Sequence, residues 1–341
     1  MKQKQIILTG KYGKSSVLVG ESIDNLAVHL PSGNVWAITD ENLYYHYRKY
    51  FNGMQVYVIE PGEQSKNFGT IVSVCRWLME QGAGRDAFIL GVGGGVVCDI
   101  AGFVASVFMR GVEFGFVATS LLAQVDGSIG GKNGVNLDGY KNIIGTFNQP
   151  GFVICDTKML HTLPPAEFKN GMAEVIKHAL IADREMFDNI LNHHMDILQL
   201  QTEVVNYLVK RSVEIKAAVV STDEREQGER RKLNLGHTWG HAVEKIEGIP
   251  HGQAVSIGLA FAAKLSEAKG ILSADERNQV VSLLKTFHLP VETKTTQIKI
   301  YEALLKDKKK EKGHIYFVLM KGIGKVKIER MSLSELQEFL M

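Results

Sequence analysis

The sequence predicts an α/β domain followed by a mainly α-helical region, and two patterns lead to this prediction. In the first half, short β-branched and aromatic runs alternate with helical stretches, which is typical of a mainly parallel sheet. From about Lys158 the strand-like runs stop and helical periodicity takes over. We therefore expect a Rossmann-like α/β nucleotide-binding domain over residues 1–157 and a mainly α-helical metal- and substrate-binding domain over residues 158–341.

The individual elements follow from local patterns. Strands are expected over residues 16–20, 35–39, 55–59, 88–91 and 152–155. One helix between them has an apolar face from Phe68 to Met79, with Ser65 as its expected N-cap and Gly82 at its end. The second half predicts helices over 166–181, 185–199, 203–220, 234–247, 252–269 and 274–287, then a hairpin over 315–319 and 325–328 and a helix capped by Ser332.

Composition excludes several classes of protein. The 341 residues are 45% hydrophobic and 22% charged, which fits a soluble enzyme of about two domains. There is no signal-peptide pattern, and no apolar run reaches the roughly 18 residues that span a bilayer. The three cysteines form no Cys-x-x-Cys pair, so we expect a reducing, cytoplasmic compartment. The formal net charge of +2 predicts neither nucleic-acid nor membrane binding.

A histidine cluster in the second half indicates a divalent-metal site. His237 and His241 are spaced i, i+4, which places them on one helix face, and His251 follows ten residues later. Glu174 and Lys177 lie at helical spacing among apolar residues, so we expect both to be buried, and a buried charge needs a partner. The competing interpretation is that two of the three histidines are ordinary buried or capping residues.

A glycine turn in the first half indicates a phosphate-binding site. The expected strand from Phe88 runs into Gly93-Gly-Gly95, and a helix follows, so backbone amides would be exposed at a helix N-terminus. The turn matches neither the Gly-x-Gly-x-x-Gly fingerprint nor a P-loop, and a turn made only for tight packing is the alternative. Lys132 lies in another glycine-rich segment, where the chain can approach a ligand closely.

Over nearly its whole length the chain resembles the sugar-phosphate cyclases, and most closely the 3-dehydroquinate synthase family. Seven motifs in the same order carry this resemblance: Gly93-Gly-Gly-x-x-x-Asp99, Val125-Asp126-Gly-Ser-Ile-Gly-Gly-Lys132, Lys141-Asn142, Ala173-Glu174-Val-Ile-Lys177, Arg230-x-x-x-Asn234-Leu-Gly-His237-Thr-x-Gly-His241, His251-Gly and Asp307-Lys308-Lys309.

The resemblance implies a lyase of the shikimate pathway. Enzymes of this family oxidise 3-deoxy-D-arabino-heptulosonate 7-phosphate with bound NAD, eliminate phosphate, reduce the ketone again and close a carbocycle. NAD is therefore recycled in each turnover. The implied partners are a sugar phosphate and a second copy of the chain in a homodimer.

The resemblance also implies the ligands of the metal, Zn²⁺ or Co²⁺. They would be Glu174, His237 and His251, with His241 outside the ligand set and assigned to proton transfer. This differs from the argument from helical spacing, which makes His237 and His241 the natural pair of metal ligands.

Matching positions around NAD are polar or glycine: Asp40, Asn42, Glu63, Lys66, Gly93, Gly94, Gly95, Asp99, Thr119, Ser120, Asp126, Lys132, Lys141, Thr162 and Glu167.

The substrate carries two anionic groups, which would account for several cations in a nearly neutral protein. By family position Lys132, Asn142, Arg110 and either Lys308 or Lys309 approach the phosphate, with Arg110 donated by a neighbouring subunit. Lys216, Arg230 and Asn234 approach the carboxylate, and Lys177 lies near the metal and the substrate hydroxyls.

Three positions depart from the family pattern. Gly127, Asn133 and Tyr140 replace a usual serine, threonine and glycine, but none removes a charged or metal-binding group.

Three other functions compete with this interpretation. A sister cyclase of the valiolone or deoxy-inosose type has a substrate without the carboxylate. Metal-dependent alcohol or glycerol dehydrogenases release NADH. An inactive metal-binding regulator would not need the set of cations.

Overall fold

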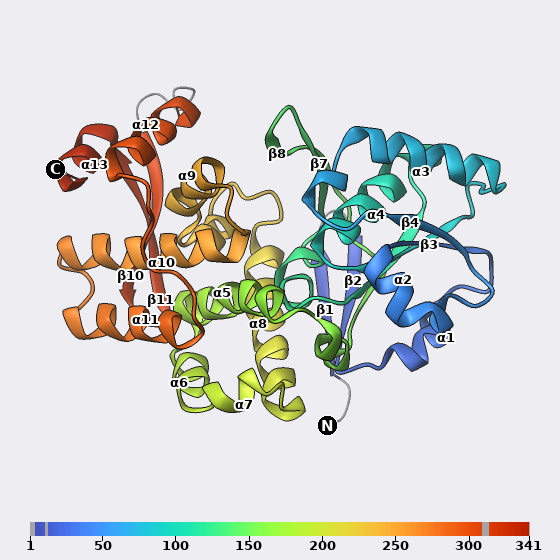
Figure 1. The fold of residues 1–341 in the computed structure, drawn as a ribbon, viewed down its shortest axis with the longest axis horizontal. Coiled ribbons are helices and arrows are strands. Elements are labelled where there is room, and N and C mark those ends of the chain that lie inside the picture. The colour runs from blue at the N-terminus through green and yellow to red at the C-terminus, as the bar shows by residue number, and fades with distance from the viewer. Residues whose placement is uncertain (1–3, 11–12, 309–313, 341) are drawn as a thin grey trace. The chain divides into compact units, whose positions relative to one another are not determined.

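The computed structural model describes residues 4–10, 13–308 and 314–340, and they form two compact units (Figure 1). The first unit comprises Met1–Phe168 and Val205–Arg225, and the second Lys169–Val204 and Glu226–Met341. Residues 205–225 return to the first unit, where Thr157 Oγ1 donates a hydrogen bond of 2.7 Å to Asn206 Oδ1. The expected functional boundary after residue 157 stays a prediction.

The first unit is built on a seven-stranded sheet with the strand order β1-β2-β9-β6-β5-β3-β4. Only the pair β1–β2 is antiparallel within this sheet. The strands are β1 (Lys4–Gly10), β2 (Gly13–Val19), β3 (Val35–Asp40), β4 (Gln55–Ile59), β5 (Phe88–Gly93), β6 (Glu113–Ala118) and β9 (Phe152–Cys155). All five expected strands are therefore present, and the sequence interpretation missed the central strand β6.

Helices and a separate hairpin complete the first unit. Its helices are α1 (Leu26–His29), α2 (Glu41–Tyr47), α3 (Phe68–Glu80), α4 (Gly95–Val107) and the larger part of α8 (Thr202–Thr222). The hairpin consists of β7 (Lys132–Leu137) and β8 (Tyr140–Phe147). The expected Ser65 cap of α3 was wrong, because Asn67 caps this helix: its side chain accepts a hydrogen bond from the Thr70 amide.

The order of the strands defines one special edge of this sheet. From β3 the chain proceeds to β4 on one side and then crosses back to β5 on the other side. The carboxyl ends of β3 and β5, at Asp40 and Gly93, therefore flank a point where the winding reverses. In open α/β sheets such a switch point is where ligands bind.

The second unit is mainly helical. It contains most of α5 (Pro165–Ala182), then α6 (Arg184–Asn192), α7 (His194–Leu198), α9 (His237–Glu247), α10 (His251–Ala268), α11 (Ala274–Thr286), α12 (Gln297–Lys308) and α13 (Leu333–Leu340). A hairpin of β10 (His314–Gly322) and β11 (Lys325–Ser332) packs against α10. No helix among the described residues is long and apolar enough to cross a membrane.

Two expected helices of the second unit differ in their bounds. The expected helix 185–199 is interrupted at His193 and forms α6 and α7. The expected helix from residue 234 begins only at His237, because Gly236 has a left-handed φ of 79° and residues 229–234 form a 3-10 helix. The helix α12 was not predicted.

The helices α9 and α10 approach each other closely at two glycines. A Cβ on Gly258 of α10 would lie 1.8 Å from the carbonyl oxygen of Gly236, which precedes α9. The same carbonyl accepts the Gly240 amide at 2.9 Å, so it is fixed by the first turn of α9. Only a residue without a side chain fits this contact, and the contact sets the distance between the start of α9 and the middle of α10.

We expect Gly258→Ala to lower the free energy of unfolding by about 3 kcal/mol, the upper end of the usual cost of overpacking. Gly33→Ala is the control, because a Cβ there meets no atom within 4 Å. The control is expected to be neutral or slightly stabilising. Urea denaturation of the two variants beside the wild type measures both values, and equal stabilities would contradict the packing argument.

Candidate functional site

The glycine turn lies at the sheet edge where the winding reverses. β5 ends at Gly93, Gly94 is the N-cap of α4, and the Thr119 amide donates a hydrogen bond of 3.0 Å to the Gly93 carbonyl. A Cβ at Gly95 would meet no atom within 4 Å, so space remains at the start of the 13-residue helix α4. A phosphate or pyrophosphate fits such a helix N-terminus, where exposed amides and the helix dipole both favour negative charge.

Polar contacts connect this turn to the β7–β8 hairpin. The Lys66 ammonium forms an ion pair with the Asp99 carboxylate of α4. The Lys66 carbonyl accepts the Asn136 amide at 2.9 Å, and Asn136 Nδ2 donates to Glu63 Oε1 at 2.7 Å. Burial raises the pKa of Asp99 to about 6, although the neighbouring Lys66 ammonium acts in the opposite direction. Three of the expected residues of the first unit, Glu63, Lys66 and Asp99, therefore occupy one neighbourhood, and sequence reasoning missed Asn136.

The other expected NAD residues occupy several positions of the first unit. Asp40 is the N-cap of α2, where its carboxylate accepts the Leu43 amide at 3.0 Å, and burial raises its pKa. Ser120 Oγ accepts the Ala123 amide at 3.2 Å. The Thr162 hydroxyl lies 2.8 Å from the Tyr47 hydroxyl. Exposed positions are held by Asn42, Lys132, Lys141 and Glu167.

Lys216 and Asp126 form a partly buried contact within the first unit. Lys216 Nζ donates to the Asp126 carbonyl and to its carboxylate, each at 2.6 Å. Asp126 lies on a π-helical turn, Ala123–Gly127, and Lys216 lies on the returning helix α8. A π-helical turn widens the helix locally and often occurs at functional sites. The contact joins an expected carboxylate-binding residue to an expected cofactor-binding residue.

Two further expected residues of the first unit are exposed. Arg110 is exposed at the end of a 3-10 helix and has a left-handed φ of 71°. Asn142, on β8, has a φ of 53°, and its amide donates to Asn136 Oδ1 at 2.9 Å. Among the departures from the family pattern, Asn133 is buried and donates to the carbonyls of Gly131 and Asn148, so it holds the loop before β7 in place.

The second unit brings a carboxylate and two imidazoles together. Glu174 comes from α5, while His237 and His251 are the first residues of α9 and α10. One donor atom from each lies within 4.8 Å of the others, and the Nε2 atoms of both histidines lie 3.5 Å from Glu174 Oε1. One carboxylate and two imidazoles are a donor set that Zn²⁺ or Co²⁺ accepts. The residues present therefore fit a divalent metal.

The alternative interpretation, in which His241 is a metal ligand, also has a geometric basis. The His241 ring lies 5.1 Å from that of His237, centroid to centroid, and 5.9 Å from that of His251. A second group of three donors within 4.8 Å consists of His241, Glu244 and His251. The assignment of Glu174, His237 and His251 as ligands thus stays a prediction. Glu244 was not considered in the sequence interpretation, although it lies three residues after His241.

The electrostatics around Glu174 favour an ionised carboxylate. Glu174 is 0% exposed, and burial alone would raise its pKa, but the Lys177 ammonium and the two imidazoles hold the pKa well below its usual range. Burial lowers the pKa of His237 well below its ordinary value. Burial also opposes the charged form of His251, but hydrogen bonds to Glu174 and Glu244 raise its pKa to about 9. An anionic carboxylate beside a neutral imidazole is what a cation requires.

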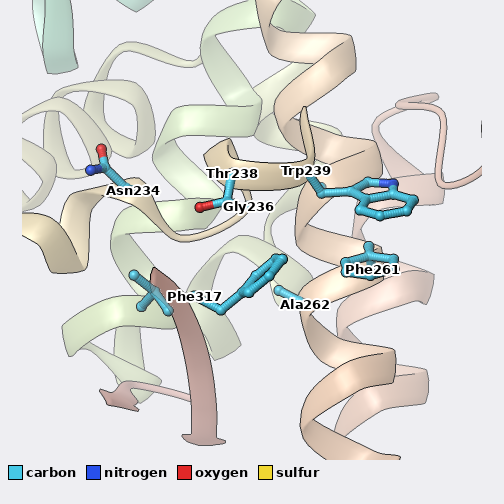
Figure 2. Close-up of a pocket in the computed structure, with 9 residues that line it drawn as sticks. Asn234, Gly236, Thr238, Trp239, Phe261, Ala262 and Phe317 are labelled. Carbon is cyan, nitrogen blue, oxygen red and sulfur yellow. The ribbon is translucent and has the colours of Figure 1, made fainter. Parts of the chain in front are cut away.

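The start of α9 is anchored by aromatic packing against α10. Figure 2 shows Asn234 and Gly236 on the turn before α9, with the Trp239 ring facing Phe261. The two rings are stacked with centroids 3.8 Å apart and an interplanar angle of 2°. Asn234 and Gly236 line a crevice between α9, α10 and β10 that has no room for a water molecule. The position of His237 is therefore fixed by a closely packed core.

The remaining expected residues of the second unit lie beside this turn or outside the described part. Arg230 is buried on the 3-10 helix Glu229–Asn234, and Asn234 Nδ2 donates to Glu226 Oε1. Lys309 lies outside the described residues, and Lys308 is described only as the last residue of α12.

Comparisons with known proteins give a consistent result over most of the chain. The family model described as 3-dehydroquinate synthase N-terminal matches residues 56–170, and the one described as 3-dehydroquinate synthase C-terminal matches residues 171–310. A 3-dehydroquinate synthase from Alkaliphilus metalliredigens (strain QYMF) is 38% identical over 317 residues, which cover 89% of this chain and 88% of that protein.

Two solved structures are similar over almost the full length. A 2-epi-5-epi-valiolone synthase from Streptomyces hygroscopicus subsp. jinggangensis 5008, with NAD⁺ and Zn²⁺ bound, has a TM-score of 0.88 and 28% identity, covering 97% of this chain and 96% of that one. A 2-deoxy-scyllo-inosose synthase complexed with carbaglucose-6-phosphate, NAD⁺ and Co²⁺ has a TM-score of 0.84 and 26% identity, covering 99% of both chains.

The ion pair of Lys66 and Asp99 predicts a pH-dependent loss of stability. Lys66→Met would leave the half-buried Asp99 carboxylate without this cation, which we expect to cost about 1–3 kcal/mol. Because Lys66 lowers the pKa of Asp99, the pKa rises above about 6 in the variant, and the carboxyl is neutral at lower pH. The loss is therefore expected to be larger at pH 8 than at pH 5.

Urea unfolding at both pH values measures this difference. Lys14→Met is the control, because Lys14 is exposed, and a change within about 0.5 kcal/mol is expected there. A loss of equal size at the two pH values would contradict the role given to the pair.

Proposed function

The chain belongs to the 3-dehydroquinate synthase family, and on this premise we propose that it converts 3-deoxy-D-arabino-heptulosonate 7-phosphate to 3-dehydroquinate and phosphate. The observation that carries the proposal is the group formed by Glu174, His237 and His251 beside Lys177. A second support is the glycine turn at the switch point of the parallel sheet. One chain thus holds a donor set for a metal and a helix N-terminus for a dinucleotide.

The metal, Zn²⁺ or Co²⁺, would be held by Glu174, His237 and His251. When bound, it supplies Lewis-acid chemistry that lowers the pKa of a substrate hydroxyl. His241 is exposed at the side of this group, with its ring 5.1 Å from that of His237, and we assign it the transfer of the hydroxyl proton. Lys177, buried beside Glu174, would contact the substrate hydroxyls and balance the charge of the carboxylate.

NAD would lie along the carboxyl edge of the sheet. Its pyrophosphate is assigned to the amides of Gly93–Gly95, and its adenosine end to the side of β3 and β4 with Asp40, Asn42, Glu63 and Lys66. When bound, NAD would supply reversible hydride transfer, accepting and returning a hydride within one turnover. The protein would therefore need only catalytic amounts of the cofactor.

The two anionic groups of the substrate are assigned to separate sets of polar residues. Lys132, Asn142 and Arg110 would bind the phosphate, and Lys216, Arg230 and Asn234 the carboxylate. Arg230 can bind a carboxylate through two parallel hydrogen bonds. The phosphate of the substrate itself can accept the proton during elimination, so the role of these residues is mainly positioning.

We also propose that the protein acts as a homodimer in the cytoplasm, with Arg110 serving the site of the partner. The exposed position of Arg110 at the end of its 3-10 helix is consistent with this role. A sister cyclase remains the second candidate, because both solved neighbours described above are such enzymes. Their substrates lack the carboxylate for which Lys216 and Arg230 are assigned.

The reaction is tested by phosphate release from 3-deoxy-D-arabino-heptulosonate 7-phosphate with catalytic NAD. We expect multiple turnovers without accumulation of NADH, loss of activity on chelation, and recovery with Zn²⁺ or Co²⁺. Accumulating NADH would favour a dehydrogenase. Turnover of a substrate without a carboxylate, and none of the heptulosonate, would favour a sister cyclase.

The two interpretations of the histidines make opposite predictions. If Glu174, His237 and His251 hold the metal, His241→Ala keeps close to one Zn²⁺ per chain but loses about 10²–10⁴ in rate, the usual contribution of a positioned proton-transfer group. His251→Ala would then lose the metal. Metal content of both purified variants, measured by mass spectrometry, decides between them, and a metal-free His241→Ala protein would refute the assignment.

A further inference from the structure

The ring of His251 lies between two carboxylates. Its Nε2 atom is 3.5 Å from Glu174 Oε1, and its Nδ1 atom is 3.4 Å from Glu244 Oε2. We propose that Glu244 is a positioning residue that accepts the Nδ1 proton of His251 and thereby directs Nε2 toward the metal. This proposal rests on the metal site of the proposed function and adds a residue to which no role has been assigned.

The location of His251 explains why its ring needs such a partner. His251 is the first residue of α10, directly after the N-cap Pro250, and its side chain is 30% exposed. A first-turn side chain with this exposure has little packing to fix its rotation. The other histidine of the group, His237, has a backbone acceptor instead, because its Nδ1 atom lies 3.1 Å from the Leu235 carbonyl oxygen. With Glu244 in place, both histidines have an acceptor at Nδ1 and present Nε2 to Glu174.

The burial of Glu244 supports the same role. Glu244 is 6% exposed, and it lies seven residues, about two turns, after His237 on the same face of α9. A buried carboxylate is costly unless hydrogen bonds stabilise it. An acceptor at the far nitrogen of a metal-bound imidazole fixes the tautomer and raises the basicity of the ligand. The carboxylate therefore has a function that an apolar residue at this position would not supply.

Glu244 also belongs to the second group of donors, with His241 and His251. As a ligand it would have to contact the metal itself, and the His251 atom facing the metal would be Nδ1 instead of Nε2. The two roles thus differ in which ring nitrogen is available. The group with Glu174 has the fully buried carboxylate and the neighbouring Lys177, so we assign Glu244 to the outer position.

The experiment measures metal binding by the full chain without substrate. Metal-free wild type, Glu244→Ala, Glu244→Gln and a control, Glu247→Gln, are titrated with Zn²⁺ in competition with a chelator, and the Co²⁺ absorption spectrum is recorded. Glu247 lies on the same helix, but its carboxylate accepts hydrogen bonds from the Thr293 hydroxyl and the Thr295 amide. We expect the Kd to rise about 10–100-fold in Glu244→Ala. The rise should be smaller in Glu244→Gln, which retains an acceptor oxygen, and absent in the control.

Two further readouts separate positioning from structure and from direct ligation. The melting temperature should fall more in the metal-loaded than in the metal-free Glu244→Ala protein, and the tetrahedral Co²⁺ spectrum should persist at full loading. An unchanged Kd with a lower metal-free melting temperature would overturn the proposal in favour of a structural role. Loss of stoichiometric binding with an altered Co²⁺ spectrum would make Glu244 a ligand and equally overturn it.

If Glu244→Ala does not fold, Glu244→Gln carries the same test, and a Kd equal to that of the wild type then refutes the proposal. Turnover is not needed for any of these measurements. A wild-type chain that binds one metal but releases no phosphate would refute the proposed function alone.

Discussion

The buried carboxylate of Glu174 is the charge on which the arrangement of the second unit depends. A fully buried anion is unfavourable unless cations or strong donors surround it, and Lys177, His237 and His251 provide these contacts. The two histidines are the first residues of their helices, so the packing of α9 against α10 sets their separation. The contact of Gly236 with Gly258 therefore helps to set the geometry of the candidate metal site, although neither side chain carries a donor atom.

The first unit gathers partial positive charge at one edge of its sheet. Its parallel strands end at one edge, where helix N-termini and peptide amides supply partial positive charge. Cationic side chains are held by carboxylates nearby, as Lys66 is by Asp99 and Lys216 by Asp126. Such pairs keep the ammonium groups ordered before a ligand arrives, at the cost of competition between ligand and carboxylate.

The sequence predicted the fold class, five strands of the main sheet and the group of Glu174, His237 and His251, because hydrophobic periodicity and family motifs are local signals. It did not predict β6, whose short run contains Gly115 in contact with the Phe152 ring, and it placed the cap of α3 two residues too early. Glu244 and Asn136 were missed because their roles depend on partners that only the folded chain brings near. Spacing alone also left two histidine pairings open, since both occur in one cluster.

The return of residues 205–225 to the first unit has a consequence for how the chain acquires its structure. A segment ending at Phe168 contains the whole seven-stranded sheet but not the helix that carries Lys216. During synthesis the first unit therefore remains incomplete until 36 residues of the second, 169–204, have also emerged, so the units cannot mature strictly one after the other. Contacts between residues 205–225 and the rest of the first unit raise the average sequence separation of contacting residues, which slows folding. Because each unit consists of two segments, no single proteolytic cut releases either unit intact.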